Sequence, residues 1–391
     1  MISVSEKNCT GCRACEAVCP AGCISFKENE NGFLLPSVDS EKCISCDMCS
    51  RLCPVGQTER NKPVRVYAAY SKEISLKSTS GGLFCALARK MLESGGVVYG
   101  TAFSEKLEAE TVRVDDINEL PRLLGSKYVQ GNTRGTYKQV RDDLEKGLRV
   151  LYSGTPCQIA GLKNSLRKTD VSRLVTVEVI CHGVTSPGMF RDYIDWFEKH
   201  NKYRVSDLAF RAKQKENGRD FCLKVTDNTG NIRFLSGFAD PYNKMYMSSQ
   251  WFREVCYSCP FASEQRVGDI TLGDFWNVEV LPDKFGSNRR VSVAVINSGK
   301  GEALFKEAGS LLVCLESSWE VAKAGNSNLC SPTSGGSGVK HYGEYKNEAS
   351  FFDEASGLGN SFAKYAFNQL PMGTRRGIKL IGRKLKHIGK G

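Results

Sequence analysis

The sequence of 391 residues contains no run of about 18 apolar residues, so it offers no segment for a membrane-spanning helix. Its first residues, MISVSEKNCTGC, lack the apolar core of a secretory signal and lead directly into cysteine-rich sequence. We therefore expect a cytoplasmic protein. No Gly-x-Gly-x-x-Gly motif follows a predicted strand, which argues against a separate dinucleotide-binding site.

Acidic residues are absent from the last stretch of the chain. Thr374 to Gly391 carries seven Lys and Arg, which leaves +4 of the formal net charge of +11 on the rest of the protein. The body is therefore near neutral, and basic residues do not alternate with aromatic ones outside the tail. The composition thus predicts no nucleic-acid partner.

The same basic stretch is amphipathic. Ile378, Ile381, Leu385 and Ile388 recur three and four residues apart, with Lys and Arg at positions between them. A helix of this kind can lie on an anionic membrane surface. A basic tail that docks on the body or stays mobile fits the pattern equally well, so peripheral membrane contact remains one of two interpretations.

Seventeen cysteines in a chain expected in the cytoplasm indicate metal binding rather than disulfide bonds. Two runs share the spacing Cys-x-x-Cys-x-x-Cys-x-x-x-Cys-Pro, which is that of bacterial ferredoxins. Three closely spaced thiolates wrap one face of a cubic 4Fe–4S cluster, and the fourth ligand comes from the other run. The runs comprise Cys9, Cys12, Cys15 and Cys19, followed by Cys43, Cys46, Cys49 and Cys53.

The exchange of the fourth ligand assigns Cys53 to the cluster of the first run and Cys19 to that of the second. A zinc site would usually take one Cys-x-x-Cys pair from each of two places, and neither zinc nor a disulfide framework explains the repeated spacing. Pro20 and Pro54 end the two loops because proline fixes φ and lacks an N–H donor. Cys23 lies outside the spacing, and we expect it to be a small buried residue.

Beyond Pro63 the sequence alternates between strand and helix patterns, as parallel β-α-β units do. We therefore predict an α+β or α/β fold, in which a ferredoxin-like two-cluster domain precedes a larger mixed α/β domain. The predicted domains are 1–62, 63–330, and a linker with a basic tail at 331–391. The predicted strands are 64–70, 97–103, 148–152 and 174–180, and the predicted helices are 83–92, 134–146, 157–166 and 187–199.

Four further cysteines are candidates for a third site. Cys157 and Cys181 each follow a predicted strand directly, and ligands gather beyond the carboxyl ends of parallel strands. Cys256 and Cys259 form a Cys-x-x-Cys knuckle that needs two more thiolates. A third cluster, a zinc knuckle and simple packing all fit this spacing. His182 is a weak catalytic candidate, as a proton donor, and is more often a hydrogen-bonding neighbour of a cluster.

Ser80, Gly81 and Gly82 precede a predicted helix, where free backbone N–H groups can hold phosphate. A capped helix without a ligand explains the same residues. The loop from Gly125 to Asn132 carries a lysine and an aromatic side chain, and a solvated connection explains it on its residues alone.

These stretches resemble the beta-subunit family of coenzyme F420 hydrogenase/dehydrogenase, whose members are flavoproteins that reduce a deazaflavin. The matching segments are SGGLFCALARKML, GSKYVQGN, GTPCQIAGLK, ICHGV, CYSCPFA and GDITLGDFW. The resemblance implies FAD, and a third 4Fe–4S cluster at the four further cysteines. It implies that Ser80, Gly81 and Gly82 lie near the flavin phosphates, that Ser126, Lys127, Tyr128 and Gln130 line the flavin, and that Asp274 approaches its ring or ribityl chain.

The resemblance implies an iron–sulfur flavoprotein oxidoreductase that converts between one- and two-electron transfer, with an organic small molecule as acceptor. Other relatives act on chlorophyll-pathway intermediates or lie among polysaccharide-biosynthesis proteins, so the fold leaves the substrate open. The ferredoxin-like unit of the chain itself suggests a soluble redox partner protein or a deazaflavin coenzyme as donor. The alternatives are a non-catalytic electron-transfer subunit that feeds a partner enzyme, and a binding protein with structural clusters.

Overall fold

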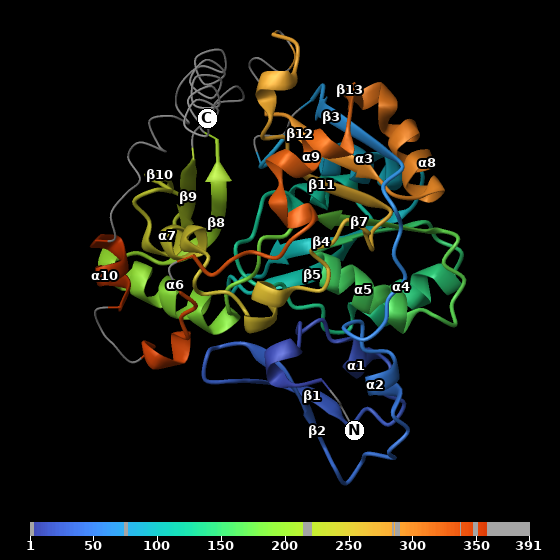
Figure 1. The fold of residues 1–391 in the computed structure, drawn as a ribbon. Coiled ribbons are helices and arrows are strands. Elements are labelled where there is room, and N and C mark those ends of the chain that lie inside the picture. Colours follow the sequence, from blue (N-terminus) through green and yellow to red (C-terminus); the bar gives the residue numbers. More distant parts are fainter. Residues whose placement is uncertain are drawn as a thin grey trace, which may run out of the picture.

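A computed structural model describes residues 4–73, 77–213, 221–283, 285, 290–336, 338–346 and 351–357 (Figure 1). The amphipathic stretch from Thr374 to Gly391, and with it the predicted membrane contact, lies outside the described residues. No helix within the described ranges combines the length and apolar character needed to cross a bilayer.

The two cysteine runs form a small N-terminal unit, which lies below the main body in Figure 1. The internal repeat extends to the backbone, because Gly11 and Arg13 in the first run and Ser45 and Asp47 in the second all have positive φ. These turns wind each loop around its cysteines before a single helical turn begins. The elements are η1 (Glu6–Asn8), α1 (Ala14–Ala17), the antiparallel strands β1 (Ile24–Glu28) and β2 (Leu34–Val38), and α2 (Met48–Arg51).

An eight-stranded mixed sheet organises the main body, in the order β13-β3-β12-β11-β7-β6-β4-β5. Four central strands, β4, β6, β7 and β11, pair in parallel, and every pairing on either side of them is antiparallel. The mixed α/β architecture predicted from the sequence is confirmed. The strands are β3 (Arg65–Ser71), β4 (Val97–Phe103), β5 (Ala109–Val114), β6 (Val150–Gly154), β7 (Leu174–Val179), β11 (Ile270–Asp274), β12 (Ser292–Ile296) and β13 (Leu312–Ser317).

Helices cover both faces of this sheet because its strands are apolar on both sides. Leu87 and Met91 of α3 are fully buried with Val98 on one face, whereas Ile159 of α5 packs with Tyr152 on the other. Helix α9 covers the latter face near β3 and β12. The covering elements are α3 (Leu83–Glu93), η2 (Ile117–Leu123), α8 (Gly299–Glu307) and η5 (Ala308–Leu311), then α4 (Thr136–Glu145), α5 (Pro156–Ser165), η4 (Val278–Val280), α9 (Trp319–Gly325) and η6 (Ser327–Leu329).

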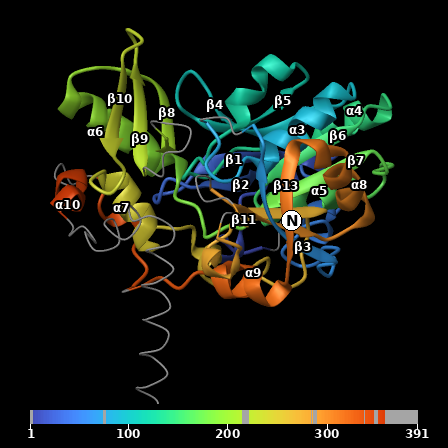
Figure 2. The same cartoon turned by 90° about the horizontal axis from the view of Figure 1, so that it is seen from above.

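A second, three-stranded antiparallel sheet lies beside the main sheet (Figures 1 and 2). Its core is aromatic: the rings of Phe190, Tyr193, Phe210 and Tyr242 pack against one another, and Phe352 joins them from the C-terminal part. The elements are α6 (Pro187–Asn201), β8 (Val205–Ala212), β9 (Cys222–Asp227), β10 (Ile232–Ser236), α7 (Pro241–Ser248), η3 (Glu254–Ser258), η7 (Tyr342–Glu344) and α10 (Phe351–Gly357).

The N-terminal unit is bound to the main body through the cysteine loops themselves. Thr133 Oγ1 donates a hydrogen bond to the carbonyl of Cys12 (3.0 Å), and Asn164 Nδ2 donates to the carbonyl of Leu52 (3.1 Å). A Cβ added at Gly161 of α5 would lie 3.1 Å from Cys12 Sγ. The first cysteine loop therefore lies against the helix whose first turn carries Cys157.

Candidate redox site

A first group of cysteines combines three residues of the first run with one of the second. Burial and, to a smaller extent, the nearby Cys9 and Cys53 raise the pKa of the Cys12 thiol to about 11. The pKa of Cys15 is raised by burial and by Cys12, Cys9 and Cys53 in turn. The structure thus brings Cys53 to the side of the first run, as the exchange of the fourth ligand would require. Four thiols of this kind provide a donor set that suits a 4Fe–4S cluster.

A second group of cysteines lines a hollow at the outer side of the N-terminal unit, called here the outer hollow. Cys19 lies there with Cys43, Cys46 and Cys49. Cys23 also lines it, with its Sγ only 3.4 Å from Cys19 Sγ. Cys23 is buried, as expected, at 6% exposed, and it borders the same hollow as the four candidate ligands. The outer hollow therefore offers five thiols.

A third group lines a hollow beyond the carboxyl ends of β6 and β7, called here the inner hollow. Cys157, Cys181, Cys256 and Cys259 all border it. Cys157 sits in the first turn of α5, where Pro156 starts the helix and the N–H of the preceding Thr155 donates to Gln158 Oε1 at 2.9 Å. The adjacency of the parallel strands β6 and β7 brings Cys157 and Cys181 to the same sheet edge.

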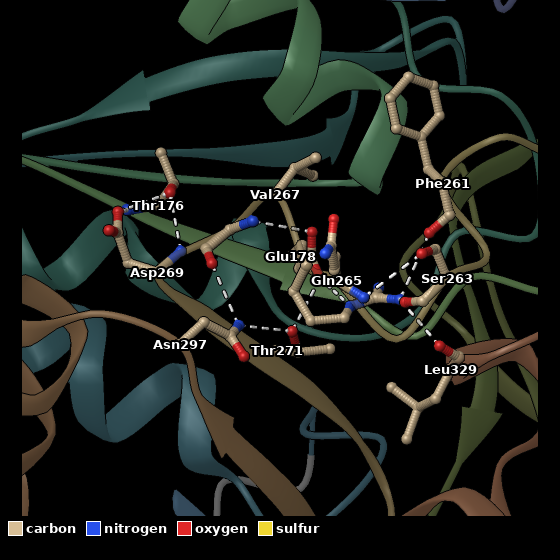
Figure 3. Close-up of polar contacts among 12 residues, drawn as sticks. Thr176, Glu178, Phe261, Ser263, Gln265, Val267, Asp269, Thr271, Asn297 and Leu329 are labelled. Atoms are coloured by element: carbon tan, nitrogen blue, oxygen red, sulfur yellow. Dashed lines mark hydrogen bonds and ion pairs between the residues drawn. The ribbon is translucent and has the colours of Figure 1, made fainter. Parts of the chain in front are cut away.

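The knuckle that carries Cys256 and Cys259 is fixed from both ends. On the N-terminal side the N–H of Cys256 donates to the carbonyl of Arg253 (2.8 Å), and the N–H of Arg253 donates to the carbonyl of Val184 (2.9 Å). On the C-terminal side Arg266 Nη1 donates to the carbonyl of Ser263 at 2.9 Å (Figure 3). These contacts hold the knuckle against the loop that carries Cys181.

The thiols of the third group favour the protonated form as long as they bind no metal. Burial raises the pKa of Cys181 and of Cys256 to about 12, and it raises the pKa of Cys157 as well. Ligation would release these protons, because thiolates are the metal-binding form. Among the described residues no three His, Cys, Asp or Glu side chains are grouped as ligands of a single metal ion. The four thiols are spread around the inner hollow instead.

His182 also borders the inner hollow. Burial lowers its pKa below the usual value of histidine, and the nearby Arg211 acts in the same direction. A hydrogen bond with Asn328 and the carboxylate of Asp274 oppose this shift. Thr333 donates a hydrogen bond to the carbonyl of His182. The net effect favours the neutral imidazole, which borders the third group of cysteines and is affected by the charges of the ion pair described next.

A buried ion pair forms the centre of the predicted flavin region. Arg211 Nη1 lies 2.7 Å from Asp274 Oδ2, and both side chains are largely buried. Burial opposes ionisation of Asp274, but Arg211 holds the pKa of its carboxyl below the usual range, and Ser80 contributes to this effect. Tyr128 stacks on Tyr246 with ring centroids 4.1 Å apart. Ser80 and Tyr128 therefore lie close enough to the Arg211–Asp274 pair to interact with it.

Two more cations lie beside this ion pair. Lys213 is buried, and its pKa is lowered to about 8 by burial and by Arg290 and Arg211. Arg290 donates to the carbonyl of Thr79 at 2.7 Å. The sequence pattern did not single out these residues as part of a site. Their convergence depends on the pairing of distant segments, and it gives the region an excess of positive charge.

The glycines before α3 are arranged differently from a free phosphate loop. The N–H of Gly81 donates to Ser292 Oγ at 2.8 Å, and a Cβ at this position would lie 2.8 Å from the carbonyl oxygen of Ala69. Gly82 caps α3 with a φ of 82°. Gly81 is therefore required by packing against the sheet, and its N–H is already engaged.

The remaining predicted flavin residues separate into two places. The N–H of Ser126 donates to Thr79 Oγ1 (2.9 Å), and Lys127 Nζ donates to the carbonyl of Leu124 (2.9 Å). Burial lowers the pKa of Lys127 to about 7. Gln130 lies instead at the edge of the inner hollow, where its Nε2 donates to the carbonyl of Thr10 at 3.0 Å. Gln130 thus contacts the first cysteine loop.

Two family comparisons match separate parts of the chain. Residues 147–315 match the family described as the C terminus of the coenzyme F420 hydrogenase/dehydrogenase beta subunit, and residues 8–57 match the 4Fe–4S dicluster domain. A solved structure of the F420-reducing NiFe hydrogenase complex from Methanosarcina barkeri is similar, with 16% identity over 69% of this chain and 89% of that chain and a TM-score of 0.45. The comparison with curated proteins finds no match.

Proposed function

We propose that this chain carries electrons through three clusters to a flavin. It is an iron–sulfur electron-transfer protein that joins a 4Fe–4S dicluster domain to a region of the coenzyme F420 hydrogenase/dehydrogenase beta-subunit family. The two clusters of the N-terminal unit receive the electrons from a soluble donor. An organic acceptor is reduced at the flavin. The proposed domains remain 1–62, 63–330 and 331–391. Tyr342 and Phe351, which belong to the third of these, pack against the aromatic core beside the three-stranded sheet.

The observation that carries this proposal is the continuity of the cysteine groups. The outer hollow borders exposed Ile44, which is 65% accessible, so a donor protein can approach the second group from solvent. Cys12 of the first group packs in one apolar cluster with Cys157 and Cys259 of the third. Tyr246 stacks on Tyr128 and extends the path from the third group toward the Arg211–Asp274 pair. The groups thus form an ordered series from surface to interior.

The residues near Asp274 fit a flavin nucleotide in part. A flavin, when bound, accepts electrons singly and releases them in pairs. Lys213 and Arg290 would hold its phosphates, and Tyr128 would contact the aromatic ring system. The engaged N–H of Gly81 does not support a phosphate at the start of α3, so we assign phosphate binding to the cations. Arg211 keeps Asp274 ionised and fixed.

A partner enzyme that receives the electrons is the second candidate function. Trp276 follows Asp274 by two residues and is 45% exposed, and Val280 nearby is also exposed. Large apolar side chains at the surface near a redox site suit a protein contact. Under this alternative the flavin is reduced by the clusters, but no small molecule is turned over without the partner. A role in polysaccharide biosynthesis rests on the resemblance alone.

The test is the content of iron, acid-labile sulfide and flavin in protein purified without oxygen. We expect about twelve iron atoms and one FAD per chain. The double variant Cys256→Ala, Cys259→Ala should retain about eight iron atoms, because only the third group is altered. Cys314→Ala, at an exposed cysteine distant from the three groups, is the matched control and should retain all of them. About eight iron atoms in the unaltered protein would contradict the third cluster.

A further inference from the structure

A buried arginine lies between the first and third groups of cysteines. Arg253 is only 3% exposed, it borders the inner hollow, and it precedes Cys256 by three residues. A Cβ placed on Gly11, between Cys9 and Cys12, would lie 2.8 Å from Arg253 Nη2. The guanidinium therefore faces the first cysteine loop while its backbone supports the third group.

Arg253 has no carboxylate partner among the described residues. Its Nη2 donates to the carbonyl of Leu34 at 2.6 Å, and its guanidinium carbon lies 4.9 Å from the ring centroid of Phe33. Its Nε is buried and has no hydrogen-bond partner within the same part of the chain. These contacts orient the side chain but supply no negative charge.

A buried charge without a counter-charge is costly, and buried arginines are normally paired with an anion. Burial lowers the pKa of Arg253, and the groups that oppose this shift are cysteines, namely Cys9, Cys256, Cys157 and Cys12. Four thiolate ligands leave a 4Fe–4S cluster with net negative charge, and this charge increases by one when the cluster accepts an electron. A nearby fixed cation therefore favours the reduced cluster.

We propose that Arg253 is the shared counter-ion of the first and third clusters and raises the reduction potential of both. This proposal rests on the proposed third cluster. Charge of a cluster and its surroundings is one of the determinants of its potential. Because Arg253 lies between the two groups, it stabilises the reduced form of either cluster. It thereby keeps the reduction potentials of the two clusters similar, so that one-electron transfer between them is close to equilibrium. The electron comes from the soluble donor, and no proton moves with it.

Gln130 also contacts the first cysteine loop. Its Nε2 donates to the carbonyl of Thr10, and its Oε1 is buried without a partner in the described structure. A Cβ on Gly11 would lie 2.6 Å from this Nε2, so Gln130 and Arg253 border the same glycine. Gln130 is therefore a positioning residue that holds the first loop against the counter-ion.

The experiment is a redox titration followed by electron paramagnetic resonance on anaerobically purified full-length protein. Arg253→Gln removes the charge, Arg253→Lys keeps it, and Arg149→Gln removes an arginine that pairs with Glu307 away from the cysteines. In Arg253→Gln we expect two of the three midpoint potentials to fall by at least ~59 mV, which corresponds to a tenfold change in the one-electron equilibrium constant. The potential of the second group should stay constant, and Arg253→Lys should retain most of the effect.

Iron content measured on the same samples separates this inference from the proposed function. About twelve iron atoms with unchanged potentials in Arg253→Gln would overturn the counter-ion and leave the three-cluster function intact. About eight iron atoms in the unaltered protein would overturn the third cluster and the shared role with it. Loss of iron in Arg253→Gln with retention in Arg253→Lys supports the role of Arg253 as a counter-ion. Equal loss in both variants would overturn it, because it would show that the shape of the arginine side chain matters and its charge does not.

Discussion

Arg266 Nε lies 2.5 Å from Glu178 Oε1 in the interior of the protein, where the two side chains are 1% and 0% exposed (Figure 3). Glu178 stands on β7, and its carboxylate also accepts from the N–H of Gly268 at 2.9 Å and from Thr271 Oγ1 at 2.7 Å. Arg266 reaches the carbonyl of Ser263 beyond the Cys256–Cys259 knuckle. The ion pair therefore joins the strand that leads to Cys181 with the segment that follows the knuckle.

The first prediction concerns this ion pair. Glu178→Gln keeps the shape of the side chain but leaves Arg266 buried without its counter-charge, which typically costs about 3–5 kcal/mol. We expect a loss of this size in the free energy of unfolding and fewer than twelve iron atoms per chain. Glu307→Gln, which breaks the surface pair with Arg149, is the control and should cost about 0–1 kcal/mol. Similar losses in both variants would contradict a special role for Glu178.

A second prediction follows from the fifth thiol in the outer hollow. Because Cys23 Sγ lies 3.4 Å from Cys19 Sγ, it can replace the fourth ligand of the second cluster when Cys19 is removed. Cys19→Ala should therefore retain most of the iron, with an altered paramagnetic resonance spectrum. The double variant Cys19→Ala, Cys23→Ala should lose about four iron atoms. Equal losses in the single and double variants would show that Cys23 cannot act as a ligand.

Sequence patterns were sufficient to predict those features that depend on residues close together in the chain. The spacing of the two cysteine runs and the strand–helix alternation each depend on residues close in the chain, and the mixed α/β fold predicted from the alternation is confirmed. The 4Fe–4S dicluster domain and the C terminus of the coenzyme F420 hydrogenase/dehydrogenase beta subunit match residues 8–57 and 147–315. Cys157 and Cys181 were expected at one sheet edge because each follows a strand. The structure brings both to the inner hollow together with the distant Cys256.

Residues whose role depends on the contact between the two domains were not predictable in the same way. Nothing near Arg253 in the sequence signals that Gly11 will lie against its guanidinium. The family resemblance implies that Gln130 lines the flavin, which stays a prediction, and nothing near Gln130 in the sequence signals its contact with Thr10 of the N-terminal unit. Cys23 was expected to be a small buried residue, and it is buried, at 6% exposed. Long-range packing decides the positions of Arg253 and Gln130.

A third prediction tests the cations near Asp274. Lys213→Gln removes one charge from the proposed phosphate site, and a hydrogen bond to a charged group is worth about 1.5–3 kcal/mol. We expect FAD to bind roughly ten- to a hundredfold more weakly, with iron content unchanged, as measured by flavin fluorescence titration of flavin-depleted protein. Lys138→Gln, at an exposed position on α4, should leave binding unchanged. Normal FAD affinity in Lys213→Gln would place the phosphates elsewhere.

The fourth prediction is the pH dependence of FAD binding. Burial and the neighbouring Arg290 and Arg211 lower the pKa of Lys213 to about 8, so its ammonium group is present at pH 7 and lost above pH 8. An anionic ligand favours the charged form, so the contribution of Lys213 to the affinity should be constant below about pH 7 and decrease as the pH rises through 8. Lys127, with a pKa lowered to about 7, can add an earlier step, which Lys127→Gln would remove. Lys213→Gln should abolish the later step, and a flat profile in the unaltered protein would argue against contact between Lys213 and the phosphates.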